Sequence, residues 1–142
     1  MDSTSVDLER FVTAQDGGGT YERAVGELRA GRKDSHWMWF LFPQIAGLGR
    51  SAVAGKFALS SLAEARAYLA HPVLGPRLLE CTSIVAETRG RSAEDVFGAV
   101  DAMKLRSSMT LFWRADPDQP LFQHVLDRHF NGVPDAGTDQ LL

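Results

Sequence analysis

The sequence predicts an all-α protein, a compact single domain of about seven or eight helices, some of them short. Apolar residues recur mostly at intervals of three and four, the period of a helix that buries one face. No alternating run of strand length bounded by turn residues accompanies them. With 142 residues, of which 44% are hydrophobic and 23% charged, the chain can bury one core. We therefore expect one helical domain over residues 1–142, with residues 1–6 flexible.

Glycines delimit the first elements. A first helix is expected over residues 7–13, and the sequence at 16–19 breaks it because three successive glycines favour non-helical backbone. Thr20 is expected to cap a second helix over residues 21–30, which Gly31 ends.

The aromatic segment, residues 36–44, reads His-Trp-Met-Trp-Phe-Leu-Phe-Pro-Gln. We expect a short helix from about Ser35 that stops before Pro43, since proline disfavours helical geometry in the residue before it. Helical spacing would place Trp37 and Phe40 on one face.

A glycine loop follows at residues 47–51, Gly-Leu-Gly-Arg-Ser. One interpretation is a tight turn between helices. The other is an anion site, because Arg50 and Ser51 lie where the next helix is expected to begin and its free amides attract phosphate.

Capping patterns delimit the remaining helices. Ser61 and Glu64 have the spacing of a capping box at the start of a helix that runs to about Ala70, and Ser92 with Asp95 repeats it. Further helices are expected over residues 76–90, 92–97, 99–113 and 121–130, with a last turn at 138–142 that Thr138 caps.

Charge and cysteine content exclude several classes of function. The net charge of −3 gives no broad positive surface, so neither nucleic acid nor a membrane is expected as a partner, and the basic runs at 29–33 and 89–91 are interpreted as solvated helix ends. Cys81 is the only cysteine, which rules out an intrachain disulfide. Since no signal peptide or membrane span is recognisable, we expect a cytoplasmic protein.

The four histidines give no metal-binding pattern. His36, His71, His124 and His129 lack carboxylates or a cysteine at the spacings of zinc ligands, so neither a metal nor any other cofactor is expected. His71 precedes a proline and is expected to hydrogen-bond the last carbonyls of the helix before it.

A polar stripe marks the helix expected over residues 99–113. Asp101, Lys104 and Ser108 project from one side of it, with Ser107 close by. The stripe is either a solvent face with one weak ion pair, worth about 0.3 to 0.5 kcal/mol, or a wall that meets a ligand, with Lys104 facing an anionic group. Lysine could also activate Ser108 as a nucleophile, but the sequence identifies no oxyanion hole.

The candidate site combines this stripe with the aromatic segment, because aromatic planes beside a few polar groups suit a flat or sugar-bearing ligand. The candidate catalytic residues are Asp101, Lys104 and His36. The candidate ligand-binding residues are Trp37, Trp39, Gln44, Arg50, Ser51, Ser107 and Ser108.

Several motifs together carry a resemblance to a known family. They are His36-Trp-Met-Trp39, Phe42-Pro-Gln44, Gly47-Leu-Gly49, Tyr68-Leu-Ala-His-Pro72, Leu74-Gly75, Phe97-Gly98 with Asp101, and Lys104-Leu105 with residues 107–112. The chain, from about Leu8 to its end, resembles the domain of unknown function family 1810. The resemblance implies a compact multihelical fold and brings no established activity with it.

The resemblance also singles out particular positions of this sequence. The family's signature includes His36, Trp37, Trp39, Gln44, Asp101, Lys104 and Ser108. Asp101 and Lys104 could serve a shared pocket or form an ion pair that fixes the fold. Some members are labelled calpastatin, a name that implies a long disordered inhibitor, and the compact apolar composition here argues against it.

Two functions fit the sequence. The first is a small-molecule pocket for a nucleotide-like, ADP-ribose-like or sugar-phosphate ligand, in which hydrolysis is one reaction that Asp101 could support. The alternative is a non-enzymatic protein–protein interaction module that uses the aromatic segment as an exposed anchor. A third interpretation makes the aromatic residues core, with function elsewhere. The sequence leaves both enzyme and binding protein open and names no protein partner.

Overall fold

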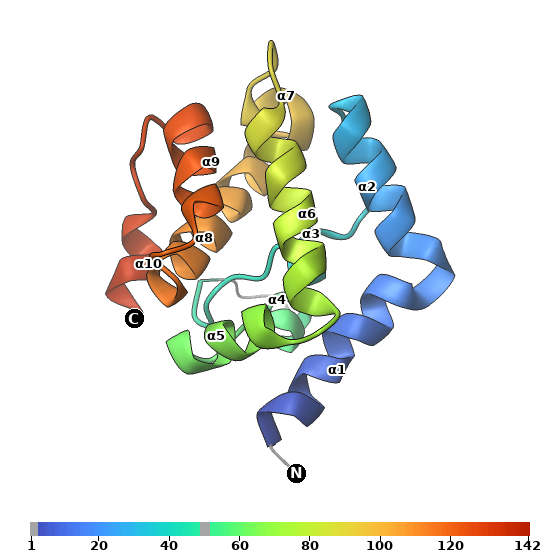
Figure 1. The fold of residues 1–142 in the computed structure, drawn as a ribbon, viewed down its shortest axis with the longest axis vertical. Coiled ribbons are helices and arrows are strands. Elements are labelled where there is room, and N and C mark those ends of the chain that lie inside the picture. The colour runs from blue at the N-terminus through green and yellow to red at the C-terminus, as the bar shows by residue number, and fades with distance from the viewer. Residues whose placement is uncertain (1–2, 49–51) are drawn as a thin grey trace.

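The described residues form helices joined by turns and loops, with no strand among them, which confirms the predicted all-α class (Figure 1). The structure, a computed structural model, describes residues 3–48 and 52–142, and the side chains of residues 8–48 and 55–142. The elements are α1 (Ser3–Asp16), the 3-10 turn η1 (Gly17–Gly19), α2 (Thr20–Ala30), α3 (Met38–Leu41), α4 (Ala52–Phe57), α5 (Leu62–Ala70), α6 (Leu74–Glu87), α7 (Ala93–Phe97), α8 (Ala99–Ala115), α9 (Pro120–Phe130) and α10 (Ala136–Gln140). Among the described residues, extended pairing is limited to an isolated parallel bridge between Ile45 and Leu59.

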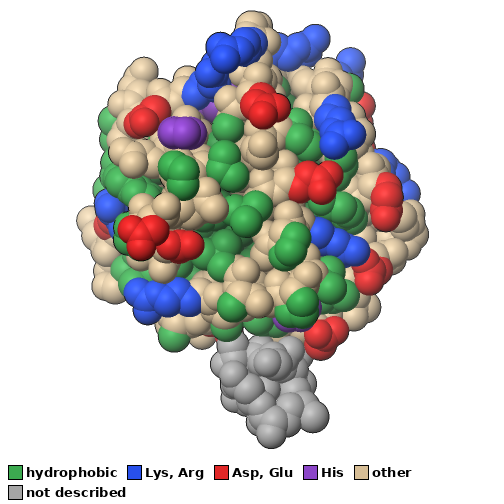
Figure 2. All heavy atoms as spheres, viewed as in Figure 1, with side chains coloured by type: hydrophobic (Ala, Val, Ile, Leu, Met, Phe, Trp, Pro, Cys, Tyr) green, Lys and Arg blue, Asp and Glu red, His purple; other side chains and the backbone are tan. Residues whose placement is uncertain are grey.

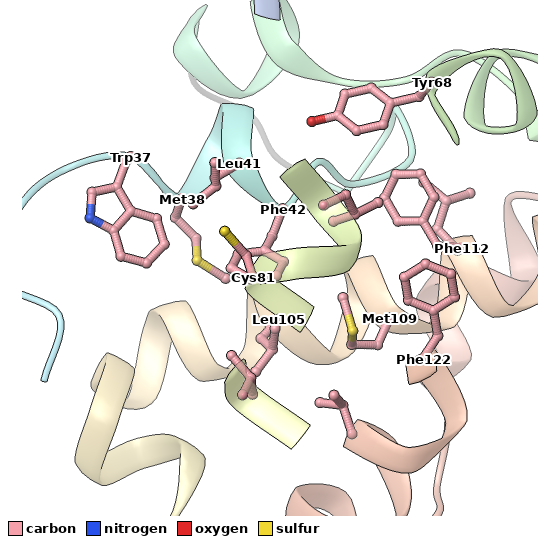
Figure 3. Close-up of a cluster of buried hydrophobic side chains, with 14 of the residues drawn as sticks. Trp37, Met38, Leu41, Phe42, Tyr68, Cys81, Leu105, Met109, Phe112 and Phe122 are labelled. Atoms are coloured by element: carbon pink, nitrogen blue, oxygen red, sulfur yellow. The ribbon is translucent and has the colours of Figure 1, made fainter. Parts of the chain in front are cut away.

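Helix α8 is the centre of the packing. It contacts α5, α7, α9 and α10, while α6 packs against α2, α5 and α9 (Figure 1). The core between them is rich in aromatic rings, and Figure 3 shows Trp37 toward one end of it, Phe42 near the middle, and Tyr68, Phe112 and Phe122 toward the other end. Burying such rings removes a large apolar area from water, which is the main driving force for this arrangement.

The first two helices are more continuous than the sequence predicts. Helix α1 runs from Ser3, within the stretch expected to be flexible, to Asp16, well past residue 13. The glycines do not unravel the chain but form a tight turn in which Gly18 and Gly19 have φ of 62° and 71°. The expected cap at Thr20 is wrong, because Thr20 is already helical and its Oγ1 donates a hydrogen bond of 2.6 Å to the Gly17 carbonyl.

The aromatic segment forms a shorter helix than expected. Helix α3 covers only Met38–Leu41, and Trp37 and Phe42 flank it, both fully buried with ring centroids 6.3 Å apart. The predicted sharing of a face by Trp37 and Phe40 is therefore wrong. The cause lies in α2, where the Glu27 carboxylate accepts hydrogen bonds from the backbone amides of residues 34 and 35 and holds that stretch out of helical geometry.

Two predicted caps are confirmed. Ser61 accepts a hydrogen bond from the Glu64 amide, and the Glu64 carboxylate reaches back to the amide of Ser60. At α7, Ser92 and Asp95 form a complete capping box, because each side chain accepts a hydrogen bond from the other's amide.

His71 caps a different helix from the one expected. Its Nδ1 accepts hydrogen bonds from the amides of Val73 and Leu74, at the start of α6. An accepting Nδ1 requires the proton on Nε2, which lies 3.2 Å from the Glu9 carboxylate. His71 therefore stabilises the beginning of α6 rather than the last carbonyls of α5.

Candidate ligand-binding cleft

A cleft of about 310 Å³ opens between the loop after α3 and the first half of α8. Its lining combines apolar and polar side chains: Gln44, Leu48, Val100, Met103, Lys104, Arg106, Ser107, Asp135 and Gly137. Val100 and Met103 are 67% and 71% exposed, unusually high for apolar residues of their size. They lie one turn apart on α8, beside the polar stripe of Asp101 and Lys104.

Two cations, Lys104 and Arg106, line this cleft, and Lys104 is the one that lies against the aromatic segment. Its Nζ lies 4.0 Å from the centroid of the half-buried Trp39 ring and 3.3 Å from Asp101 Oδ1. Trp39 in turn lines a smaller hollow of about 70 Å³ that shares Gln44 with the cleft. The Gln44 side-chain amide makes no hydrogen bond to any described residue. Trp39, Gln44 and Lys104 therefore bring an aromatic plane, a free amide and an ammonium to one place.

A second lysine neutralises Asp101. Lys33 Nζ lies 2.9 Å from Asp101 Oδ2 and donates a 2.6 Å hydrogen bond to the Ser35 carbonyl, and its side chain is only 7% exposed. It also lies 5.0 Å from the centroid of the Trp37 ring. Two ammonium groups thus share one carboxylate, which leaves this cluster with a net positive charge. Through this ion pair, Asp101 links α8 to the connector, the segment of residues 31–37 between α2 and α3.

Glu27 fixes that connector. Its carboxylate accepts hydrogen bonds from the amides of Asp34 and Ser35, the Ser35 hydroxyl at 2.6 Å and the Trp37 indole N–H at 3.0 Å. Partial burial opposes ionisation, but these four donors outweigh it and lower the pKa of Glu27 to about 2. The backbone that carries Lys33 and the aromatic segment is therefore held by one ionised carboxylate.

The structure brings five of the predicted site residues together. Gln44, Lys104 and Ser107 line the cleft, while Trp39 and Asp101 contact Lys104. Helical spacing explains Lys104 and Ser107, which lie one turn apart on α8. Folding brings the aromatic segment to the same side.

The other predicted site residues lie elsewhere. Trp37 is fully buried and bonded to Glu27, and His36 is exposed and does not line the cleft. Ser108 is fully buried, and its hydroxyl has no hydrogen-bond partner among the described residues. Arg50 and Ser51, proposed for an anion site at the glycine loop, lie outside the described residues.

The far wall of the cleft is formed by α10 and the loop before it. Asp135 caps α10 by accepting from the Thr138 amide and hydroxyl, and its Oδ2 also accepts a 3.0 Å hydrogen bond from the Ser107 hydroxyl. The cap predicted at Thr138 is therefore wrong, because Asp135 takes that position. Arg106 donates to the carbonyls of residues 133 and 134, which ties the loop to α8.

Sequence reasoning missed Lys33 and six of the residues that line the cleft: Leu48, Val100, Met103, Arg106, Asp135 and Gly137. The spacing of Asp135 and Thr138 is itself a capping signal, and Val100 and Met103 lie one turn apart beside the polar stripe, so local patterns could have found these three. Lys33 reaches the site only through the fold.

Other chemistries find little support in the described part of the chain. Burial raises the pKa of the Cys81 thiol to about 12, which keeps it protonated and unreactive. No group of three histidine, cysteine or acidic side chains among the described residues lies close enough to hold a metal ion. Within the same residues, no helix combines the length and apolar character needed to cross a bilayer.

Comparison with known proteins places the chain in one family. Residues 5–142 match the family described as "Protein of unknown function (DUF1810)". A search of the curated proteins found no significant match. Among solved structures, the fold is similar to the crystal structure of the conserved hypothetical protein Rv1873 from Mycobacterium tuberculosis, with a TM-score of 0.92, 52% sequence identity and 96% of each chain covered. The protein therefore belongs to the DUF1810 family.

Proposed function

We propose that this domain binds a small anionic molecule of the nucleotide or sugar-phosphate class in the cleft between the loop after α3 and α8. The observation that carries the proposal is the meeting of Trp39, Lys104 and Gln44. Lys104 lies over the Trp39 ring and faces the cleft, and Gln44 lines both the cleft and the hollow beside Trp39. Lysine recognises phosphate as a point charge, and a side-chain amide suits a base edge or a hydroxyl.

The charge of the cluster supports an anionic ligand. Lys33 pairs with Asp101 at 2.9 Å, closer than Lys104 does at 3.3 Å. The positive charge of Lys104 is therefore only partly balanced inside the protein, and an incoming anion completes the balance. The apolar side chains of Val100 and Met103, which line the cleft, strengthen the attraction between Lys104 and an anion, because apolar walls reduce screening by water.

The size of the cleft narrows the class of ligand. A volume of about 310 Å³ lies at the lower end of the range of roughly 300 to 1,000 Å³ typical of small-molecule sites. It suits a mononucleotide or a sugar phosphate better than the larger ADP-ribose.

Binding is better supported than hydrolysis. A general base needs a carboxylate free to take a proton, whereas each Asp101 oxygen is already paired with a lysine ammonium. His36 lies outside the cleft. The Ser107 hydroxyl donates a hydrogen bond to Asp135, so it has a structural role. We therefore propose a binding site in which Asp101 is a positioning residue for Lys104.

The interaction-module alternative has less support from the burial of the aromatic segment. Trp37, Met38, Leu41 and Phe42 are at most 1% exposed, so they act as core rather than as anchors for a partner. Partner binding would have to use Trp39 or the exposed pair Val100 and Met103.

Thermal unfolding tests the proposal. Adenosine monophosphate, ribose 5-phosphate and ADP-ribose would each be titrated against the wild type, Lys104→Met and the matched control Lys56→Met. Lys56 is exposed and lies outside the cleft. A ligand at about one hundred times its Kd adds roughly 2.7 kcal/mol, or about 5 to 10 °C for a domain of this size.

We expect at least one of the first two compounds to stabilise the wild type and the Lys56→Met variant, and to lose its effect on Lys104→Met. Stabilisation that Lys104→Met retains would place binding elsewhere. No stabilisation by any compound would favour the interaction module.

A further inference from the structure

A second cleft, which we call the arginine cleft, lies where the end of α6 meets α7 and α9. It has a volume of about 350 Å³ and is lined by Thr88, Arg89, Gly90, Arg91, Ser92, Arg128 and His129. Figure 2 shows Lys and Arg side chains gathered along the upper edge of the molecule, where Figure 1 places the turn between α6 and α7. The arginine cleft shares no lining residue with the cleft at Lys104.

The charge of this cleft is strongly one-sided. The described residues that line it include three guanidinium groups and no carboxylate, in a chain whose net charge is −3. Arg89 and Arg128 form no ion pair or hydrogen bond with any described residue. Like charges placed together repel one another, and an anionic ligand relieves that cost.

The backbone that carries the arginines is held firmly. The Thr88 hydroxyl donates to the Ile84 carbonyl, Gly90 turns the chain with φ of 74°, and the capping box fixes Ser92. Arg91 packs its side chain against Gly31 and donates to the Gly31 carbonyl. A fixed backbone lowers the entropy that these residues lose when a ligand binds, although Arg91 alone has its side chain held as well.

The contact of α9 with α6 positions the third arginine. His129 lies next to Arg128, and its Nε2 is 2.9 Å from the Val85 carbonyl, to which it donates a hydrogen bond. This bond links the end of α9 to α6, so Arg128 faces the loop that carries Arg89 and Arg91.

We propose that the arginine cleft binds the diphosphate group of a small molecule. Guanidinium groups form paired hydrogen bonds with phosphate oxygens, and three of them match the charge and the several acceptors of a diphosphate better than those of a single phosphate.

An adjoining cleft of about 720 Å³ has room for the rest of the ligand. It shares Arg89 and Arg128 with the arginine cleft and adds Leu121 with His124. Glu87 and Asp127 also line it and can accept hydrogen bonds from hydroxyl groups.

A small molecule fits better than a nucleic acid. The net charge of the chain opposes long-range attraction of a polyanion, whereas a diphosphate is small enough to interact only with the local field of the arginines. The volume of the arginine cleft, about 350 Å³, also suits a group of limited size.

Calorimetric titration with inorganic pyrophosphate at low ionic strength tests this proposal. The proteins are the wild type, the double variant Arg89→Gln/Arg128→Gln, the control Arg23→Gln/Arg66→Gln and Lys104→Met. Both arginine pairs are exposed and both double variants change the net charge equally, so the control removes the effect of overall charge. Circular dichroism would confirm that all four are folded.

Saturable binding of pyrophosphate to the wild type, to the control and to Lys104→Met, weakened by about tenfold or more in Arg89→Gln/Arg128→Gln, would support the arginine cleft. Adenosine diphosphate as a second titrant distinguishes free pyrophosphate from an organic diphosphate as the ligand.

Equal affinity of the two double variants, or no saturable binding, would overturn the proposal. A loss confined to Lys104→Met would also overturn it, while leaving the proposed function at the other cleft intact. A short single-stranded oligonucleotide that binds more tightly than either diphosphate would show that the arginines serve nucleic acid instead.

Discussion

Asp101 illustrates how one side chain joins structure to function. It pairs with Lys33, whose side chain is 7% exposed, and with Lys104, which faces the cleft. A nearly buried ammonium that loses its carboxylate keeps the cost of its burial without the compensating attraction.

We therefore expect Asp101→Ala to lower the free energy of unfolding by about 2 kcal/mol or more. The double variant Lys33→Met/Asp101→Ala should recover much of that loss, because it removes the unpaired charge. Urea denaturation of the wild type, both single variants and the double variant measures the coupling. Additive losses would show that the two residues do not act as a pair.

The ionisation of Glu27 makes the free energy of unfolding depend on pH. Its four hydrogen bonds lower the pKa from 4.5 to about 2. A carboxylate with a lowered folded-state pKa stabilises the fold above its unfolded-state pKa, and that stabilisation is lost as pH falls toward the folded-state value. Glu27→Gln should be less stable than the wild type at neutral pH, by about 1 to 3 kcal/mol.

The difference between Glu27→Gln and the wild type should narrow as the pH falls from about 5 toward about 2. Denaturant unfolding across that range measures it. A difference that does not change with pH would mean that the Glu27 charge plays no part in holding the connector.

Sequence patterns located those site residues whose position depends on local spacing. Lys104 and Ser107 follow from the period of α8, and Gln44 from the end of the aromatic segment. Trp37 and Trp39 look alike in sequence, yet the first is fully buried and the second half-buried, because Glu27 of α2 binds the indole of Trp37. Such a contact between distant segments leaves no local signal.

The end of α5 and the start of α6 approach each other so closely that no side chain fits at Gly75. A Cβ on Gly75 would lie 2.1 Å from the Leu69 carbonyl oxygen, so the two helix backbones would have to move apart. The glycine is therefore required by close approach.

Gly75→Ala should lower the free energy of unfolding by about 1 to 3 kcal/mol, the usual range for overpacking. Gly26→Ala is the matched control, because a Cβ there meets nothing within 4 Å, and it should stabilise α2 by about 0.5 to 1 kcal/mol. Thermal melts measure both variants, and we expect the Tm to fall in Gly75→Ala and to rise in Gly26→Ala. A change of the same sign in both would contradict the role given to Gly75.

Helix α10 is held on α8 by its cap. Asp135→Ala removes the acceptor of the Thr138 amide and of the Ser107 hydroxyl, and should cost about 1 to 2 kcal/mol. Hydrogen exchange should show faster exchange at the α10 amides. Asp135→Asn keeps a capping oxygen and should retain most of the protection; equal exchange in both variants would contradict the role of the cap.

Helix ends were predictable where the cap lies beside its helix, as at Ser61 and Ser92. They were misplaced where a partner from elsewhere competes. His71 turned toward α6 because the free amides of its first turn are the nearest donors, and Asp135 displaced Thr138 because it also binds Ser107 of α8.

The fold class followed from properties of the whole chain. Apolar spacing and composition predicted one helical domain, and the buried rings from Phe11 to Phe122 form its core. The two clefts depend on how helices meet in space. One brings α8 beside the loop after α3, and the other brings α9 beside the turn after α6. Neither arrangement is encoded by the spacing within a single segment.

The most direct test of the proposed cleft is nitrogen–proton NMR of the tryptophan indole groups during titration with adenosine monophosphate and ribose 5-phosphate. The chain has three tryptophans, and of these Trp39 alone lies against Lys104 at the cleft. We predict a saturable shift of the Trp39 signal with one of these ligands, little change at Trp37 and Trp113, and loss of the shift in Lys104→Met but not in Lys56→Met. A Trp39 signal that neither ligand moves, or that moves equally in Lys104→Met, would contradict the proposed site.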